Sequence, residues 1–377
     1  MQHRRFVNLV LDTFDGGRTA YALHRIDVSG LFIHRGGSSP AGATDEDNAS
    51  LPPPAMTFHP TGSVSVGNVD FLPFTGSEGE DVVALGHDGH GLLYGAASRA
   101  AHVLPALHRH KGSVSPISLT AGGANDSLYV IERRPFYTDP CCFAVLSHGI
   151  RPGGWSRDDF PRHGMSPGWY WRSLPPPPFA YASYHECFTT CRPAARAEDY
   201  GIAACAASSG GARLWVTLAQ GGGTYSFDTA TGAWSEAAGD WALPFRGRAE
   251  YVPEHGLWFG LSSGWDWLVY LRAADLTGAM GRPRRVWEWD AGLAPPSEEW
   301  SPAGPGEVYL VPLGCGKFCV ARFFEDDRGR HRCAVFTGVE VTKDGGGASG
   351  GLRMLKHQSR RYNFLDKDFR RCFGRVF

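Results

Sequence analysis

The sequence has no long hydrophobic run and no long helical pattern. No stretch approaches the roughly 18 consecutive apolar residues of a membrane-spanning helix. No long segment combines apolar residues at the helical period with residues that cap helix ends. These absences argue against a membrane-spanning or mainly helical protein, and they favour a chain of strands and turns.

Charge of either sign is also scarce. Asp, Glu, Lys and Arg make up 20% of the 377 residues, and the net charge is −1 at neutral pH. A nearly neutral chain is not predicted to bind nucleic acid or an anionic membrane as its main partner. The local exception is residues 352–377, which hold eight Lys or Arg and two Asp. We expect 344–377 to be a Gly-rich linker and a solvated, partly frayed basic tail, with a closing strand, nuclear import or an anionic partner as alternatives.

Signals for export are missing as well. The first apolar run is short, contains Asn8 and is followed by Asp12 and Asp15, which fits neither a signal peptide nor a transit peptide. Nine cysteines, an odd number, do not suggest a disulfide framework. We therefore predict free thiols and a location in the cytosol, the nucleus or both.

Glycine, proline and aromatic residues, in contrast, are abundant, and they are typical of strands joined by tight turns. The chain has 49 Gly, 26 Pro and 12% aromatic residues. In one hairpin, Tyr225 and Phe227 alternate with polar residues, Asp228 begins a turn that ends at Gly232, and Trp234 is expected to pack inward. An isolated hairpin is marginal in water, so this one must belong to a larger sheet.

Short apolar strands with a central aromatic residue recur at a regular interval. Tyr129, Trp215 and Trp258 are separated by 86 and 43 residues, which are two periods and one. Complete sets of four strands can be written within 202–236 and 248–290. Radially packed four-stranded sheets form a β-propeller.

We therefore predict an all-β fold, a single β-propeller of four-stranded blades over residues 1–343. Six blades are expected, with five or seven as alternatives. A closed ring leaves no open sheet edge, so strands at 6–14 and 21–28 should meet strand residues near the C-terminus. Residues 35–55 have few apolar side chains and are expected to form a mobile loop.

Three phrases of the sequence resemble a known family. They are GTYSFDTATGAW, DWALPFRGRAEYVPEHGLWFGL and the pair FLPF and DVVALGHDGHGLLY. They look like the plant family, expanded in grasses, that is catalogued as domain of unknown function 1668, whose members are similar to kelch-type propellers. The likeness covers about residues 5–341 and implies a fold but no activity. The double glycine that ends the second kelch strand is replaced here by Gly260-Leu261.

Two other propeller classes have weaker support. A WD40 protein would match Gly86-His87 and Trp265-Asp266, but these pairs do not recur. A sialidase-like protein would match Ser226, Phe227 and Asp228 with Trp234, yet this approximation to an Asp-box is one residue too long and occurs once.

Motifs for metal or phosphate chemistry are incomplete. His185, Glu186, Cys187 and Cys191 supply only part of a zinc site, and a loop with free thiols is the expected interpretation. We expect His102, His108 and His110 to be solvated. The glycines at 221–223 are not followed by the lysine and helix of a phosphate loop. The sequence therefore predicts no catalytic residue, no metal and no cofactor.

A candidate binding rim lies around the best-described blade. Arg246 and Arg248 connect two blades, and an aromatic loop follows with Trp265, Asp266 and Trp267. Arginine and tryptophan dominate the binding energy of protein interfaces. The alternative is structural, with the arginines bonding loop carbonyls or a neighbouring carboxylate.

These observations predict a monomeric protein-interaction module, an adaptor or scaffold for an unidentified protein. The alternative is a propeller enzyme, sialidase-like or another hydrolase, with its site in the central channel or on one rim. A cluster of His, Tyr, Asp and Arg at the channel mouth would favour the enzyme. A broad aromatic and arginine-rich surface would favour the adaptor.

Overall fold

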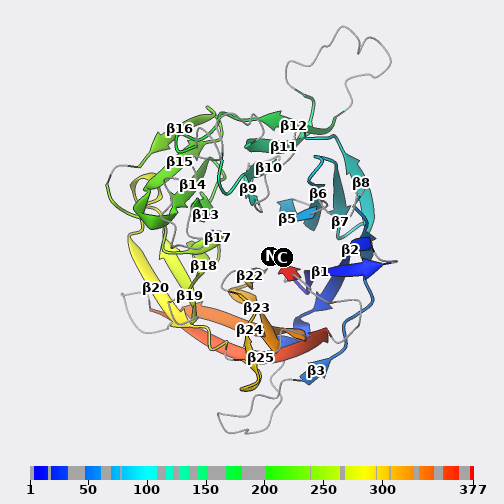
Figure 1. The fold of residues 1–377 in the computed structure, drawn as a ribbon. Coiled ribbons are helices and arrows are strands. Elements are labelled where there is room, and N and C mark those ends of the chain that lie inside the picture. The colour runs from blue at the N-terminus through cyan, green and yellow to red at the C-terminus, as the bar shows by residue number, and fades with distance from the viewer. Residues whose placement is uncertain are drawn as a thin grey trace. The chain divides into compact units, whose positions relative to one another are not determined.

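The computed structural model describes most of the chain (Figure 1). The described residues are 4–15, 18–32, 47–60, 69–76, 79–107, 116–121, 127–135, 142–151, 167–180, 201–237, 239–263, 268–293, 295–304, 307–326, 331–343, 351–364 and 374–377. The chain divides into two compact units. The first contains Met1–Ser65, Val252–Leu276 and Arg284–Phe377, and the second contains Val66–Tyr251 and Thr277–Pro283.

The second unit contains three sets of four antiparallel strands, and the strands of each set follow one another along the chain. The first sheet contains β5 (Val69–Gly76), β6 (Gly79–Gly86), β7 (Gly91–Gly95) and β8 (Ala100–Leu104). The next contains β9 (Ile117–Ala121), β10 (Ser127–Ile131), β11 (Phe143–Gly149) and β12 (Gly168–Ser173). The third contains β13 (Ile202–Ala207), β14 (Arg213–Leu218), β15 (Thr224–Asp228) and β16 (Ala233–Glu236), and β17 (Arg246–Val252) pairs with β13 in parallel. Short 3-10 turns follow β14 (η4, Ala219–Gly221) and occupy Ala279–Gly281 (η5).

The first unit is also built from β-sheets. One sheet has the order β26-β1-β2-β4, with β1 (Phe6–Asp15), β2 (Arg18–Asp27), β4 (Met56–Phe58) and β26 (Gly374–Val376). The antiparallel strands β18 (Leu257–Ser263), β19 (Val269–Asp275) and β20 (Arg285–Asp290) follow one another. The last sheet contains β21 (Trp300–Pro302), β22 (Val308–Gly314), β23 (Lys317–Asp326), β24 (Arg332–Lys343), β25 (Leu352–Phe364) and β3 (Asp47–Ala49). A 3-10 turn, η1 (Ser29–Phe32), follows β2.

The two ends of the chain meet in one sheet, as the sequence predicts. β26 pairs antiparallel with β1, so that Leu9 lies opposite Val376 and Leu11 opposite Gly374. Asn8 and Phe377 exchange two backbone hydrogen bonds of 3.0 Å. The C-terminal residues thus cover the edge of β1 that β2 leaves open.

The core of the second unit confirms the packing predicted for Trp234. Its ring lies 5.1 Å from that of Phe227 and 5.3 Å from that of Phe143 on β11, and its indole N–H donates to the Pro175 carbonyl at 3.1 Å. The rings of Phe143 and Phe227 themselves meet edge to face at 4.8 Å. Trp234 therefore joins the β13–β16 sheet to the β9–β12 sheet with aromatic contacts.

Two segments expected to be loose are held by backbone pairing. The basic segment is not a frayed tail over 352–364, because β25 pairs with β24 along most of its length. The predicted mobile loop at 35–55 is fixed in its second half: β3 pairs with β25 in parallel, and Pro52 accepts a hydrogen bond of 2.7 Å from His24 Nδ1. Residues 33–46 and 344–350 lie outside the described residues. Composition failed as a guide here because the charged residues of 352–364 are interspersed with apolar side chains, of which Tyr362 and Phe364 are buried in the core.

The all-β class and its four-stranded repeating unit are confirmed. The part of the chain that the structure describes contains strands and short 3-10 turns but no α-helix. It therefore contains no helix long and apolar enough to cross a membrane. The number of blades, the kinship with kelch repeats and the domain boundary at 343 stay predictions.

Candidate functional site

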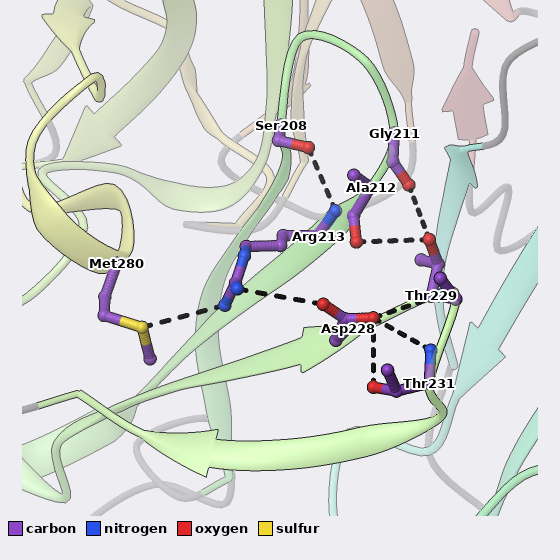
Figure 2. Close-up of polar contacts among 9 residues, drawn as sticks. Ser208, Gly211, Ala212, Arg213, Asp228, Thr229, Thr231 and Met280 are labelled. Atoms are coloured by element: carbon purple, nitrogen blue, oxygen red, sulfur yellow. Dashed lines mark hydrogen bonds and ion pairs between the residues drawn. The ribbon is translucent and has the colours of Figure 1, made fainter.

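The Asp-box-like turn holds its own hairpin together (Figure 2). The Asp228 carboxylate accepts hydrogen bonds from the backbone N–H and hydroxyl of Thr231 at 2.9 and 3.0 Å, and from the Ala230 N–H at 3.1 Å. These hydrogen bonds, led by the Thr231 N–H, hold the pKa of Asp228 below its usual value. Arg213 lies 3.7 Å from the carboxylate and also reaches the sulfur of Met280. The carboxylate is directed at the protein itself, which is a structural role.

The predicted rim is described only in part. Arg246 is exposed at the start of β17. Arg248 forms an ion pair with Glu250 on the same strand and donates to the Ser118 carbonyl on β9 at 3.5 Å. Its contacts match the structural alternative. Trp265, Asp266 and Trp267 lie outside the described residues, so the rim stays a prediction.

The other motifs singled out from the sequence do not converge in the described residues. His102 is exposed on β8, while His108 and His110 lie outside the described residues, as do the four candidate zinc ligands between 185 and 191. Within the described ranges, no three His, Cys, Asp or Glu side chains are placed to hold a metal ion. Cys205 and Cys319 are buried free thiols, and burial raises the pKa of each to about 12.

A polar cluster that sequence reasoning missed lies in the first unit. Arg332 on β24 binds Glu325 at 2.9 Å and Glu307 at 3.3 Å. The Tyr309 hydroxyl on β22 donates to the Gly374 carbonyl at 2.9 Å.

Charges around this cluster act on Asp12. Burial raises the pKa of Asp12 to about 6 and outweighs the attraction of Arg375 and Arg332, while the repulsion of Glu307 adds to the increase. Burial also raises the pKa of Tyr309 to about 12, so its phenol is a hydrogen-bond donor at neutral pH. Arg332 binds two carboxylates of the protein itself, and the hydrogen bond from Tyr309 fastens β26 to β22.

A solvent-facing groove lies in the second unit. Its hollow has a volume of 290 Å³ and lies between the chain that leaves β8 and the β11–β12 hairpin. It is lined by Pro105, Ala106, Gly149, Arg151, Gly168, Trp169, Tyr170 and Trp171. We call this surface the β8–β12 groove.

Aromatic packing fixes the wall of the groove. Trp169 contacts Phe74 of β5 edge to face at 5.7 Å and His148 of β11 at 5.0 Å. Trp171 is 8% exposed, and its indole N–H meets no acceptor among the described residues. Such a buried donor is costly unless something accepts its hydrogen bond. The wall therefore offers an aromatic surface fixed by packing, while the Trp171 N–H itself is buried.

Apolar and basic side chains border the same groove. Val103 is 82% exposed and Ile150 is 56% exposed, and they are two of the four large hydrophobic residues most exposed in the described structure. The described segments 99–107, 142–151 and 167–180 contain no Asp or Glu, but they contain Arg99, His102, His148, Arg151 and Arg172. Within these described segments every charged side chain is therefore basic, and Arg151 is the one that lines the hollow.

One sequence signal could have pointed to this groove. Trp169, Tyr170 and Trp171 are consecutive, whereas a half-buried strand normally alternates apolar with polar residues. The partner segment at Pro105 is 64 residues away along the chain, so only the fold brings the two together.

Comparisons with known proteins give a family but no activity. The model of the family described as "Protein of unknown function (DUF1668)" matches residues 4–362. No curated protein matches the chain.

Solved structures resemble the chain only weakly. Hydrazine synthase of Kuenenia stuttgartiensis is 12% identical, with a TM-score of 0.39 and coverage of 78% of this chain and 69% of that one. A putative 6-phosphogluconolactonase of Bacteroides fragilis is 10% identical, with a TM-score of 0.37 and coverage of 95% and 98%. The WD40 domain of SCAP from fission yeast is 8% identical, with a TM-score of 0.33 and coverage of 91% and 72%.

Proposed function

The chain belongs to the DUF1668 family, which is described without an activity, and we propose that it acts as a protein-interaction module. The binding surface is the β8–β12 groove, and the ligand is a segment of a partner protein. The proposal includes a location in the cytosol or nucleus and a monomeric state.

The observation that supports this proposal is a rigid aromatic groove with exposed apolar borders. Large contiguous apolar patches are rare on the surfaces of proteins in water, and where they occur they usually mark interaction sites. Trp, Tyr and Arg are the residues that dominate interface energy, and Trp169, Tyr170 and Arg151 all line the hollow. A hollow of 290 Å³ accommodates one or two side chains of a partner rather than a large cofactor.

The test is affinity purification from an extract of the source organism, with identification of bound proteins by mass spectrometry. The baits are the unaltered chain and a groove variant that carries Val103→Asp and Arg151→Glu. Both positions are exposed, so the fold should survive, and thermal melting checks this. Partners that bind the unaltered chain and are lost from the groove variant support the proposal.

Two further baits serve as controls. Arg353 is exposed on β25, away from the groove residues in sequence, and Arg353→Glu repeats the charge reversal without touching the groove. A rim variant with Arg246→Ala and Trp265→Ala tests the rim predicted from the sequence. If all baits recover the same proteins, or if only the rim variant loses them, the groove is not the binding surface.

A further inference from the structure

We propose that the partner segment is acidic and extended, and that it adds as a further strand to the open edge of β8 with one end in the groove. This inference rests on the proposed function and specifies its ligand. It follows from the edge of β8, the continuity of that edge with the groove, and the charge around both.

β8 is a sheet edge without the usual protection. It is the last strand of its sheet, and its outer edge pairs with no strand in the described part of the chain (Figure 1). Ala101, His102 and Val103 are exposed in succession, so neither face of the strand is covered there. Proteins usually protect such edges with charged side chains or with another segment.

Three of the other last strands carry that protection, whereas β4 (Met56–Phe58), like β8, contains no charged residue. β12 contains Arg172, β16 contains Glu236, and β20 contains Arg285, Glu288 and Asp290. β8 contains no charged residue and begins with two alanines. Small side chains allow the backbone of an added strand to approach, and unpaired backbone groups then supply its hydrogen bonds.

The edge leads directly into the groove. Leu104, the last residue of β8, is followed by Pro105 and Ala106, both of which line the hollow. A segment that runs along β8 therefore reaches Trp169 and Tyr170 within a few residues. Strand addition supplies affinity through backbone hydrogen bonds, and a pocket at its end supplies selectivity.

The charge at the groove favours an acidic segment. Arg151 lines the hollow, and its guanidinium is suited to bind a carboxylate. With no Asp or Glu in the three bordering segments, carboxylates of the partner meet no repulsion from them. These features favour Asp or Glu beside an aliphatic or aromatic side chain.

Single-stranded nucleic acid also binds surfaces of aromatic and basic residues. An open strand edge, however, offers alternating N–H and C=O groups, which match a peptide backbone and not a phosphate backbone. We therefore infer a peptide, and an oligonucleotide serves as the competing probe.

The experiment begins with a random 12-residue peptide library displayed on phage and selected on the immobilised full chain. We expect enrichment of sequences with Asp or Glu next to alternating apolar residues. Binding of a selected synthetic peptide should fall about tenfold with Arg151→Glu, because the reversed charge repels an acidic peptide. Arg353→Glu is the matched control and should leave the affinity unchanged.

Backbone addition is tested on the peptide, so that the fold of the protein is not disturbed. Each amide of the selected peptide is methylated in turn, which removes one donor at a time. Along an added strand, only alternate amides face the sheet, so methylation should weaken binding about tenfold or more at every second position and little in between.

The outcomes separate this inference from the proposed function. Acidic enrichment with the alternating pattern supports both. Groove-dependent peptides that lack acidic residues, or that tolerate methylation at every amide, overturn the inference and leave the proposed function standing. If the chain selects no groove-dependent peptide, both fail, and this includes the case in which an oligothymidylate binds in its place and is lost on Arg151→Glu.

Discussion

At the scale of single residues, Gly374 is a position where the fold leaves no room for a side chain. A Cβ there would lie 2.0 Å from the ring of Phe323, which is fully buried. We expect Gly374→Ala to lower the free energy of unfolding by about 1–3 kcal/mol, the usual effect of overpacking a core. Gly210→Ala is the control, because a Cβ at that position meets nothing within 4 Å. Urea unfolding compares the two, and equal stabilities would show that the contact between Gly374 and Phe323 yields easily.

Asp12 should make stability depend on pH. Its pKa is about 6 in the folded chain, against 3.8 as the ordinary value. Between these values the folded state binds more protons than the unfolded state, so the contribution of Asp12 to stability is lost as the pH rises. Arg375, Arg332, Glu307 and Tyr309 face the same carboxyl, and Asp12→Asn leaves them in place.

We therefore expect Asp12→Asn to gain stability relative to the unaltered chain as the pH rises from 4.5 to 7.5, by up to about 2 kcal/mol. Denaturant unfolding at both pH values measures this difference. If the stability of Asp12→Asn relative to the unaltered chain stays constant or falls as the pH rises, Asp12 is not buried as described.

At the scale of elements, the short strand β26 covers the edge of β1 that would otherwise be open for pairing. Removal of residues 374–377 deletes three cross-strand pairs and the hydrogen bonds that Phe377 makes with Asn8 and Arg4. We expect the shortened chain to melt at a lower temperature and to associate as its concentration rises, because an open apolar edge pairs with other chains. Phe377→Ala keeps the backbone pairing and should remain monodisperse in light scattering. A shortened chain as stable and monodisperse as this control would contradict the role of β26.

Individual strands could be predicted well because their information is local. Alternation around Phe227 and the turn from Asp228 to Gly232 give a hairpin that the structure reproduces, with Asp228 bonded to Thr231 as turn chemistry requires. The sequence does not predict strand β3, because its three residues, Asp47–Ala49, are too few to show an apolar pattern and pair with β25, which is far along the chain. Sequence patterns indicate which side chains are buried, but they do not show which distant strand a backbone pairs with.

At the scale of the whole molecule, the candidate site could not be predicted for a related reason. Pro105 and Trp169 both line the β8–β12 groove, and no sequence motif around either residue predicts that the other lies nearby. Arg246 and Trp265 are candidates only because their residue types are common at interfaces. Residue type alone does not say where in the fold a side chain lies. Residue type indicates a chemistry that is common at interfaces, while the fold decides where those side chains gather.

The prediction of a single domain can be tested with two buried thiols. Cys205 belongs to the second unit and Cys319 to the first, and burial raises the pKa of each to about 12, so neither should react while its unit is folded. A closed single domain unfolds as one cooperative unit, so both thiols should become reactive at the same urea concentration. Pulse labelling with an alkylating reagent and peptide mass spectrometry gives the two midpoints. The exposed Cys315 is labelled at every concentration and reports that the reagent is active. Two well-separated midpoints would mean that the units unfold independently and that the single-domain prediction is wrong.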